Sequence, residues 1–323
     1  MKYHLGALLL LFCGHLCSGW FKFQGDLRLI NPRTLQRYLR FGNSLSHWGY
    51  EHGANESPPD QWDKKFPACK GAQQSPIAIN TAKTIRSSRL EPLLFHAYSS
   101  FPEANLWTVV NNGHTVQFGG SYNSSYLPTL SKGGLAADYA FTQLHFHWGT
   151  TSLRGSEHVI NDKRFPLELH IVHRHSSGDN REAHGNSTGL AVVGILFELT
   201  SDERKRLRQL DTIAEALTEV IEQNKPANVT LEHFTLSGLL PPSTGYYRYM
   251  GSLTTPPCTE AVQWFVMKKP QKITEKQLSA FRRLDDGNGL SGLDKLGDNF
   301  RPLQAPYQRR IENYRGKELR FSQ

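Results

Sequence analysis

The sequence has few cysteines and no repeated or low-complexity block, and its only long apolar run lies at the N-terminus. Glycine has no period of three, which excludes a collagen-like rod. A single apolar run excludes a channel that crosses a membrane many times. Aromatic residues are not scarce, since the 323 residues include 17 Phe, 12 Tyr and 6 Trp, and this excludes intrinsic disorder. These exclusions leave one globular unit of roughly 200–300 residues with additions at its ends.

The apolar run covers residues 5–19 and follows a single basic residue, Lys2. It is too short to span a membrane, and its length and small C-terminal residues are typical of a secretory signal. We therefore predict a signal peptide over residues 1–19, cleaved before Trp20; the alternative is a buried first helix. Residues 20–45 hold five basic residues and one acidic residue. We expect a solvated N-terminal extension there, with a pro-segment or a polyanion- or matrix-binding arm as alternatives.

Removal of the signal peptide would leave two cysteines, Cys69 and Cys258, which form one candidate disulfide in an oxidising compartment. Four glycosylation sequons favour the same compartment. They begin at Asn55, Asn123, Asn186 and Asn228. The polar C-terminal tail, residues 316–323, offers no apolar segment for a lipid anchor. We expect a secreted, extracellular, soluble protein with no membrane anchor and no nucleic-acid partner.

Strand-like segments dominate the remainder of the chain, because short runs rich in Val, Phe, Trp and Thr alternate with turn signals. The clearest are residues 107–113, 141–148, 167–173, 189–199 and 261–267. Apolar residues at helical spacing predict one long helix over residues 201–224, and a shorter helix is expected over 274–284. The pattern indicates a single β-dominated α+β domain.

Three histidines are spaced as metal ligands. His145 and His147 are two residues apart in a predicted strand, so both side chains leave the same face, and His170 lies on the next strand. If the two strands pair antiparallel, three imidazoles converge and leave zinc an open position, as in catalytic sites. Gln143 and Glu168 each precede a histidine by two residues and could accept its ring N–H. A histidine pair alone is often structural, but the third histidine and the two acceptors favour a metal.

Many segments, in order, resemble the α-class carbonic anhydrases from His47 to about residue 312. They are HWGY (47–50), QSPIAI (74–79), NNGHTVQF (111–118), QLHFHWG (143–149), GSEHVI (155–160), ELHIVH (168–173), GLAVVGI (189–195), YRYMGSLTTPPCTEAVQW (247–264) and NFRPLQ (299–304). The resemblance implies a catalytic domain over 46–315 with a large, mostly antiparallel, twisted sheet and short peripheral helices. It also implies zinc-dependent reversible hydration of CO2 to bicarbonate and a proton, by attack of a zinc-bound hydroxide. Sulfonamides and anions would inhibit it.

The resemblance also implies roles for individual residues. The three histidines would be the zinc ligands. Thr254 would accept a hydrogen bond from the hydroxide and donate its own hydroxyl hydrogen bond to Glu157, and Thr255 would lie beside the bicarbonate. His114, after a turn signal, would carry protons from an open cleft and titrate near neutral pH. Alternatively, Glu157 is an ordinary surface acid and His114 a solvated loop histidine.

Further matched positions are polar groups that order water and an apolar wall for CO2. The water-ordering residues would be Tyr50, Asn112 and Gln117, of which Gln117 departs from the family's usual Asn. The wall would comprise Val172, Val192, Leu253, Val262 and Trp264. Cys69 and Cys258 match the disulfide of secreted and membrane-anchored members. Some other histidines match no catalytic position and are expected to be structural or on the surface: His158, His173, His175 and His184.

A binding or matrix protein that has lost catalysis is the competing interpretation. Such relatives usually lose a zinc histidine. Here His145, His147 and His170 are all present, together with Thr254 and Glu157. The sequence therefore favours an active enzyme.

Overall fold

The structure is a computed structural model that describes residues 48–50, 56–176, 188–287 and 295–316. The predicted signal peptide, the extension over residues 20–45, the sequons at Asn55 and Asn186, and His184 lie outside these residues. So does the predicted tail beyond Gly316. Their assignments remain predictions.

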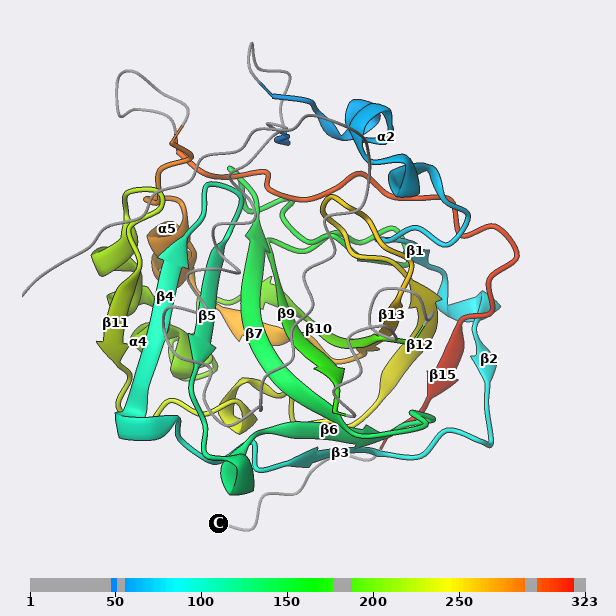
Figure 1. Ribbon diagram of the computed structural model, residues 1–323, viewed down its shortest axis with the longest axis horizontal. Coiled ribbons are helices and arrows are strands. Elements are labelled where there is room, and N and C mark those ends of the chain that lie inside the picture. Colours follow the sequence, from blue (N-terminus) through cyan, green and yellow to red (C-terminus); the bar gives the residue numbers. More distant parts are fainter. Residues whose placement is uncertain (1–47, 51–55, 177–187, 288–294, 317–323) are drawn as a thin grey trace, which may run out of the picture.

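A large, twisted sheet organises the described chain (Figure 1), with strands in the order β11-β4-β5-β7-β9-β10-β13-β12-β15-β2. Most neighbouring strands are antiparallel, whereas β10 and β13 are parallel. The strands of this path are β2 (Ile85–Arg86), β4 (Leu106–Asn111), β5 (Val116–Gly120), β7 (Tyr139–Trp148), β9 (Leu167–His175), β10 (Leu190–Leu199), β11 (Ala227–Thr230), β12 (Tyr246–Gly251), β13 (Val262–Met267) and β15 (Glu312–Tyr314).

Smaller elements complete the sheet and cover its periphery. Strands β3 (Leu93–His96), β6 (Thr129–Lys132) and β14 (Gln271–Ile273) extend the large sheet, and β1 (Ala78–Ile79) pairs with β8 (Val159–Ile160). The α-helices are α2 (Trp62–Lys65), α4 (Gln209–Ala216) and α5 (Glu275–Phe281). The predicted β-dominated, mostly antiparallel domain with short helices is confirmed. No helix in the described part of the chain has the length and apolarity that a membrane crossing requires.

The predicted helix over residues 201–224 is too long. Asp202 accepts hydrogen bonds from the backbone and guanidinium of Arg204, and the Leu207 amide donates to the Lys272 carbonyl instead of to a preceding helical turn. These contacts hold residues 201–208 in turns, because side-chain bonds of this kind compete with helix formation. The α-helix therefore begins at Gln209, and a 3-10 turn, Leu217–Val220, ends it.

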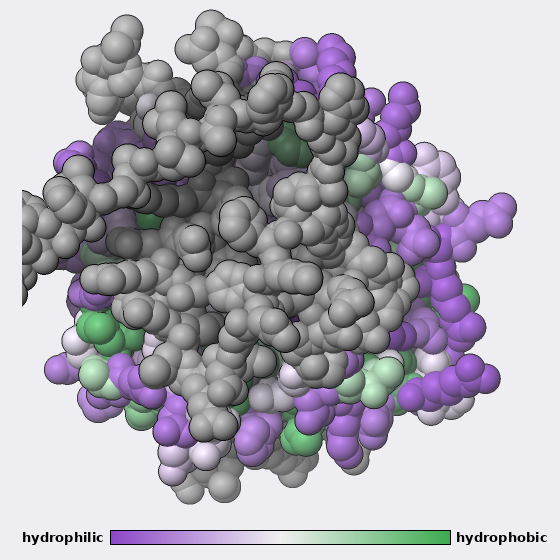
Figure 2. Space-filling view, viewed as in Figure 1, coloured by the Kyte–Doolittle hydropathy of each residue, from purple (hydrophilic) through white to green (hydrophobic). Residues whose placement is uncertain are grey.

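Alternation along β7 separates the core from the functional face. Phe146 and Trp148 point into the main core, where both rings pack against Phe281 of α5. His145 and His147 therefore point to the other face. Seen from the same side, Figure 2 shows hydrophilic side chains around much of the described rim of the molecule.

Candidate metal centre and active site

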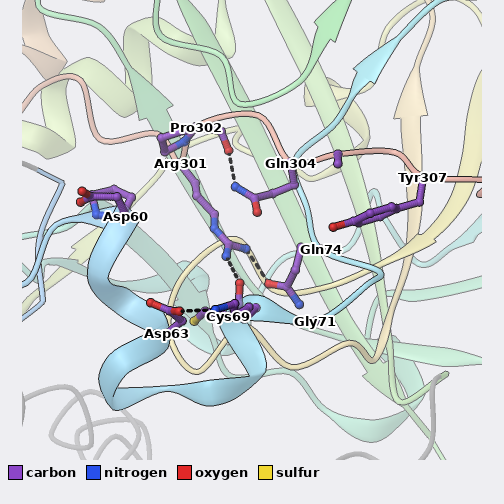
Figure 3. A pocket seen from close by; sticks show the side chains of 12 residues that line it. Asp60, Asp63, Cys69, Gly71, Gln74, Arg301, Pro302, Gln304 and Tyr307 are labelled. Carbon is purple, nitrogen blue, oxygen red and sulfur yellow. Dashed lines mark hydrogen bonds and ion pairs between the residues drawn. The ribbon is translucent and has the colours of Figure 1, made fainter.

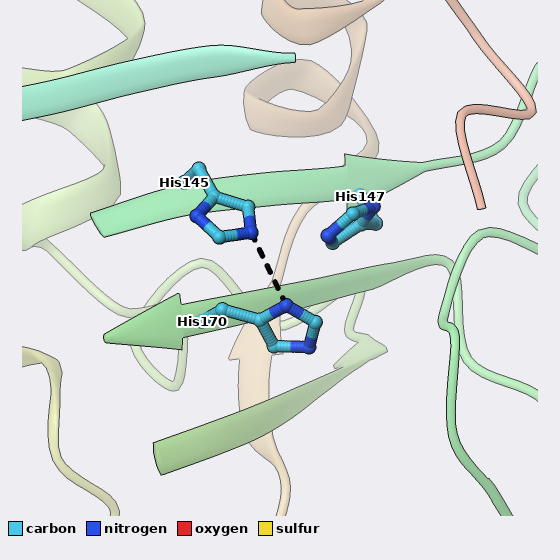
Figure 4. A group of neighbouring side chains, drawn as sticks. All are labelled: His145, His147 and His170. Carbon is cyan, nitrogen blue, oxygen red and sulfur yellow. Dashed lines mark hydrogen bonds between the residues drawn. The ribbon is translucent and has the colours of Figure 1, made fainter. Parts of the chain in front are cut away.

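The three predicted ligand histidines meet on the face of β7 and β9. His145 lies directly opposite His170 in the antiparallel register, and His147 follows two residues along β7. The rings of His147 and His170 are 4.7 Å apart, and both are 5.1 Å or less from that of His145. One ring nitrogen from each histidine lies within 4.8 Å of the others (Figure 4).

Each histidine has a hydrogen-bond partner on the nitrogen that faces away from this centre. His145 Nδ1 is 2.9 Å from Gln143 Oε1, and His170 Nε2 is 2.8 Å from Glu168 Oε1. His147 Nδ1 is 2.7 Å from the backbone carbonyl of Asn299. All three partners accept, so a neutral ring donates outwards and presents a lone pair to the centre. Asn299 was missed from sequence, because a main-chain acceptor 152 residues away leaves no pattern.

The inward nitrogens fit a metal ion. His147 Nε2 is buried and has no hydrogen-bond partner among the described residues. His145 Nε2 and His170 Nδ1 lie 3.3 Å apart, although neither carries a proton in the tautomers just described. Burial, followed by the neighbouring histidines, lowers the pKa of His145, and burial lowers that of His147 as well. Three converging imidazole nitrogens, with no fourth side-chain ligand among the described residues, are the donor set of a catalytic zinc site.

Glu168 organises the region behind His170. Its Oε1 also contacts His158 Nδ1 at 2.6 Å, and its Oε2 accepts the backbone N–H groups of Glu157 and His158, each at 2.8 Å. Burial alone would raise the pKa of Glu168, but the charge and hydrogen bonds of His158 and His170 outweigh burial and hold it well below its usual range. An acceptor with four contacts cannot rotate freely, so it fixes the ring of His170.

Glu157 lies beside the same centre. Its Oε1 accepts the Arg301 backbone N–H at 2.9 Å, while its buried Oε2 has no hydrogen-bond partner among the described residues. Oε2 is 3.5 Å from His147 Nε2 and 3.9 Å from His170 Nδ1. Thr254 is buried in the loop after β12, but the expected hydrogen bond from its hydroxyl to Glu157 is not formed in this structure. Thr255 follows in the same loop and is partly exposed.

The predicted CO2 wall is brought together in one apolar cluster beside the histidines. The ring of Trp264 lies 4.8 Å from that of His170. The other members come from three strands and the Thr254 loop: Val172, Val192, Leu253 and Val262. They would also pack together in an inactive relative, so the cluster supports a small apolar ligand without identifying it.

His114 differs from the open, near-neutral group that we expected. Its ring stacks on Trp48 with centroids 3.9 Å apart and planes at 13°. Burial lowers the pKa of His114 to about 4. The backbone of His114 is held on one side by Asn112 Oδ1 and on the other by the amide of Asn299, which donates to its carbonyl at 2.9 Å. Trp48 was not singled out from sequence, although it lies in the matched segment HWGY.

The other predicted water-ordering groups border the same site. Gln117 lies opposite His145 in the register of β5 and β7 and is partly buried. The Tyr50 hydroxyl is buried without a hydrogen-bond partner among the described residues. Burial, and secondarily the charge of Glu157, raises the pKa of Tyr50 well above its usual value. Tyr50 is therefore neutral at physiological pH.

A disulfide joins Cys69 to Cys258, as predicted, and spans 189 residues of sequence. It fixes the start of the domain to the loop that carries Thr254. Gln74 reinforces this connection, because its side-chain amide donates to the Cys258 carbonyl at 3.1 Å.

Beside the disulfide lies a cavity of about 370 Å³ (Figure 3). Arg301 lines it, and its guanidinium donates to Gln74 Oε1, Ser75 O and Cys69 O. Burial lowers the pKa of Arg301 to about 10, although Glu157 opposes that shift. Arg301 therefore connects the cavity wall with Glu157, the carboxylate beside the three histidines. The sequence carries no signal of this role, because Arg301 meets these partners only through contacts between distant segments.

The two described sequons are sterically accessible. Asn123 is exposed at the start of a short 3-10 turn, and Asn228 is exposed on β11 at the edge of the sheet. Whether either is glycosylated stays a prediction.

Comparisons with known proteins identify the family. The family model for eukaryotic-type carbonic anhydrase matches residues 57–315. The chain is 38% identical to mouse carbonic anhydrase 7 over 261 residues, which cover 80% of this chain and 93% of the mouse protein. It is 37% identical to human carbonic anhydrase 7 over 261 residues, or 80% of this chain and 94% of the human protein. With its buried histidine centre, apolar wall and twisted sheet, the chain belongs to the α-class carbonic anhydrases, the zinc-dependent carbonate dehydratases.

Proposed function

We propose that this protein catalyses the reversible hydration of CO2 to bicarbonate and a proton, with a zinc ion held by His145, His147 and His170. The observation that carries the proposal is the buried His147 Nε2, which has no hydrogen-bond partner among the residues that the structure describes and lies beside two other inward-facing ring nitrogens. A bound zinc ion would supply a Lewis acid that lowers the pKa of water to about 7, a general property of carbonic anhydrases rather than a value from this structure.

Thr254 and Glu157 would orient the attacking oxygen. Glu157 Oε2 is buried, lies 3.5 Å from His147 Nε2 and has no hydrogen-bond partner in the described part of the chain. We therefore assign it as the acceptor of the hydrogen bond that the Thr254 hydroxyl donates. A threonine that donates to Glu157 can only accept from the nucleophile, which directs a lone pair of that nucleophile towards CO2. CO2 has no dipole, so the wall that includes Val192 and Trp264 needs only to exclude water and fit its shape. Thr255 would hold the product bicarbonate.

His114 would accept the proton that the reaction releases, through water ordered by Tyr50, Asn112 and Gln117. Its backbone is fixed by Asn112, while its side chain lies in contact with Trp48. In the stacked position the imidazole is a poor proton acceptor, because its pKa is about 4. We therefore propose that transfer requires the ring to leave Trp48 and become hydrated.

We also propose that the protein is secreted to the extracellular space and glycosylated. The disulfide supports this, because such bonds persist mainly in oxidising compartments, and Asn123 and Asn228 are accessible. The basic extension over residues 20–45 would bind polyanions or matrix only as an addition to catalysis. A heparin-column salt series with and without that extension tests this role.

The decisive experiment is a stopped-flow CO2 hydration assay on secreted protein whose zinc content has been measured. The proposal expects one zinc per chain, hydration activity, and inhibition by an aromatic sulfonamide. Thr254→Ala should retain zinc and lose most activity, which separates metal binding from orientation. Zinc-loaded protein without activity would instead support the inactive, binding-protein interpretation.

A further inference from the structure

A series of buried hydrogen bonds leads away from the candidate metal centre through His170. It starts at His170 Nε2, passes through Glu168 Oε1 and reaches His158, whose Nδ1 contacts that same oxygen. His158 Nε2 is 2.7 Å from the Tyr249 hydroxyl, which in turn is 2.9 Å from Ser75 Oγ. Each of these residues is at most 2% exposed.

This series of hydrogen bonds ends at the loop that carries Thr254. Ser75 and Ser252 exchange two hydrogen bonds: the Ser252 amide donates to Ser75 Oγ at 3.1 Å, and the Ser75 amide donates to Ser252 Oγ at 2.9 Å. Ser252 is two residues before Thr254. The far end of the loop is held separately, by Gln74 and the disulfide at Cys258. Segment 69–75 is therefore bonded to both ends of the loop.

Local packing preserves this junction. A β-carbon on Gly251 would lie only 2.2 Å from Ser75 Oγ and 2.8 Å from the Tyr249 ring. Any side chain at that position would displace both partners, so Gly251 leaves the space in which they meet. Trp264 also donates its indole N–H to the Ser252 carbonyl at 3.1 Å.

We propose that Tyr249 is a positioning residue, which transmits the geometry of the ligand His170 to the Ser252–Cys258 loop and thereby sets the position of Thr254. This inference rests on the proposed function of Thr254. Buried polar chains are costly unless every member is satisfied, and each member then constrains the next. Loss of the Tyr249 hydroxyl would leave His158 Nε2 and Ser75 Oγ without that shared partner. The loop would then keep only its contact with His170 through Trp264.

A double-mutant cycle tests this mechanism. Tyr249→Phe should lower kcat/KM for CO2 by about tenfold in the wild-type background. In the Thr254→Ala background the same change should have less than a twofold effect, because the residue through which it acts is already gone. Equal effects in the two backgrounds would overturn the proposal, and so would unchanged kcat/KM in Tyr249→Phe.

Tyr246→Phe is the matched control. Tyr246 is a fully buried tyrosine on the same strand, its hydroxyl donates to the Glu91 carbonyl at 2.7 Å, and its ring packs in the main core instead of the site cluster. It should destabilise the fold while leaving kcat/KM within twofold of the parent value. A loss of kcat/KM as large as that of Tyr249→Phe would mean that Tyr249 contributes only stability.

A second readout does not depend on activity. In wild-type protein, zinc loading should slow hydrogen exchange of the amides in residues 252–258, and Tyr249→Phe should reduce that dependence on zinc. Exchange that responds to zinc equally in both proteins would overturn the proposal. If Tyr249→Phe does not fold, Ser75→Ala must give the same result. Inactive but zinc-loaded wild-type protein would refute the proposed function, whereas the exchange measurement would still decide the coupling.

Discussion

Removal of the Trp48 ring should make His114 a better proton acceptor. In the stacked position burial lowers the pKa of His114 from 6.5 to about 4. That difference corresponds to a penalty of about 3 kcal/mol for protonating the imidazole. Trp48→Ala exposes the ring face to water, so the pKa should rise to roughly 5 or higher, because the penalty comes from desolvation.

The consequence for turnover follows from the direction of the shift. A proton donor of pKa about 7 transfers uphill to an acceptor of pKa about 4, and a smaller gap reduces that barrier. Trp48→Ala should therefore raise kcat in weak buffer and leave kcat/KM unchanged, because CO2 attack precedes proton release. An NMR titration of His114 and stopped-flow kinetics provide the two measurements.

His114→Ala in the Trp48→Ala background is the control. It should cancel the gain in kcat, and added imidazole should restore it by carrying protons from solution. A His114 pKa that stays near 4 after Trp48→Ala would refute the desolvation argument. A raised pKa with unchanged kcat would show instead that another group carries the proton.

Three further perturbations test the site and the fold. His147→Ala should lose most bound zinc while retaining the β-sheet circular dichroism spectrum, and full zinc occupancy would contradict the ligand assignment. Cys69→Ser should lower the free energy of unfolding by up to about 5 kcal/mol, since the bond spans 189 residues, and alkylation with mass analysis of the wild type should find no free thiol. Burial lowers the pKa of His173 to about 4, so the unfolded chain binds the proton first. The contribution of neutral His173 to the free energy of unfolding should therefore be fully present above pH 6.5 and decline towards pH 4. His173→Gln should weaken that decline in urea titrations.

The sequence predicted the strands and the histidine centre because both depend on short-range alternation. His145 and His147 must share a face of any strand, and β9 follows β7 closely enough to pair with it. Gln143 and Glu168 were found by the same two-residue spacing. The roles of the remaining site residues still depend on the family resemblance.

Long-range contacts explain what was missed. Asn299 and Arg301 reach the site from the C-terminal segment through backbone groups, which any residue type supplies. The burial of His114 against Trp48 could not be read from a turn signal, which predicts only local geometry. The length of the helix predicted over residues 201–224 was overestimated for a related reason. Its apolar spacing was correct, but a backbone hydrogen bond from Leu207 to Lys272 replaced its first turns.

The arrangement of the sheet also constrains how the chain folds during synthesis. Central strand β10 acquires its parallel partner β13 only after some seventy further residues, and edge strand β2 pairs with β15, near the end of the described chain. Likewise, segment 69–75 cannot make its contacts until the loop at Ser252–Cys258 has been synthesised. In a ribosome-bound chain that stops before β13, strand β10 has no neighbour on that side. Apolar side chains of β10 then stay exposed, and chaperones can bind them. Folding should therefore be slow and occur late in translation, as expected for a domain dominated by non-local strand pairing.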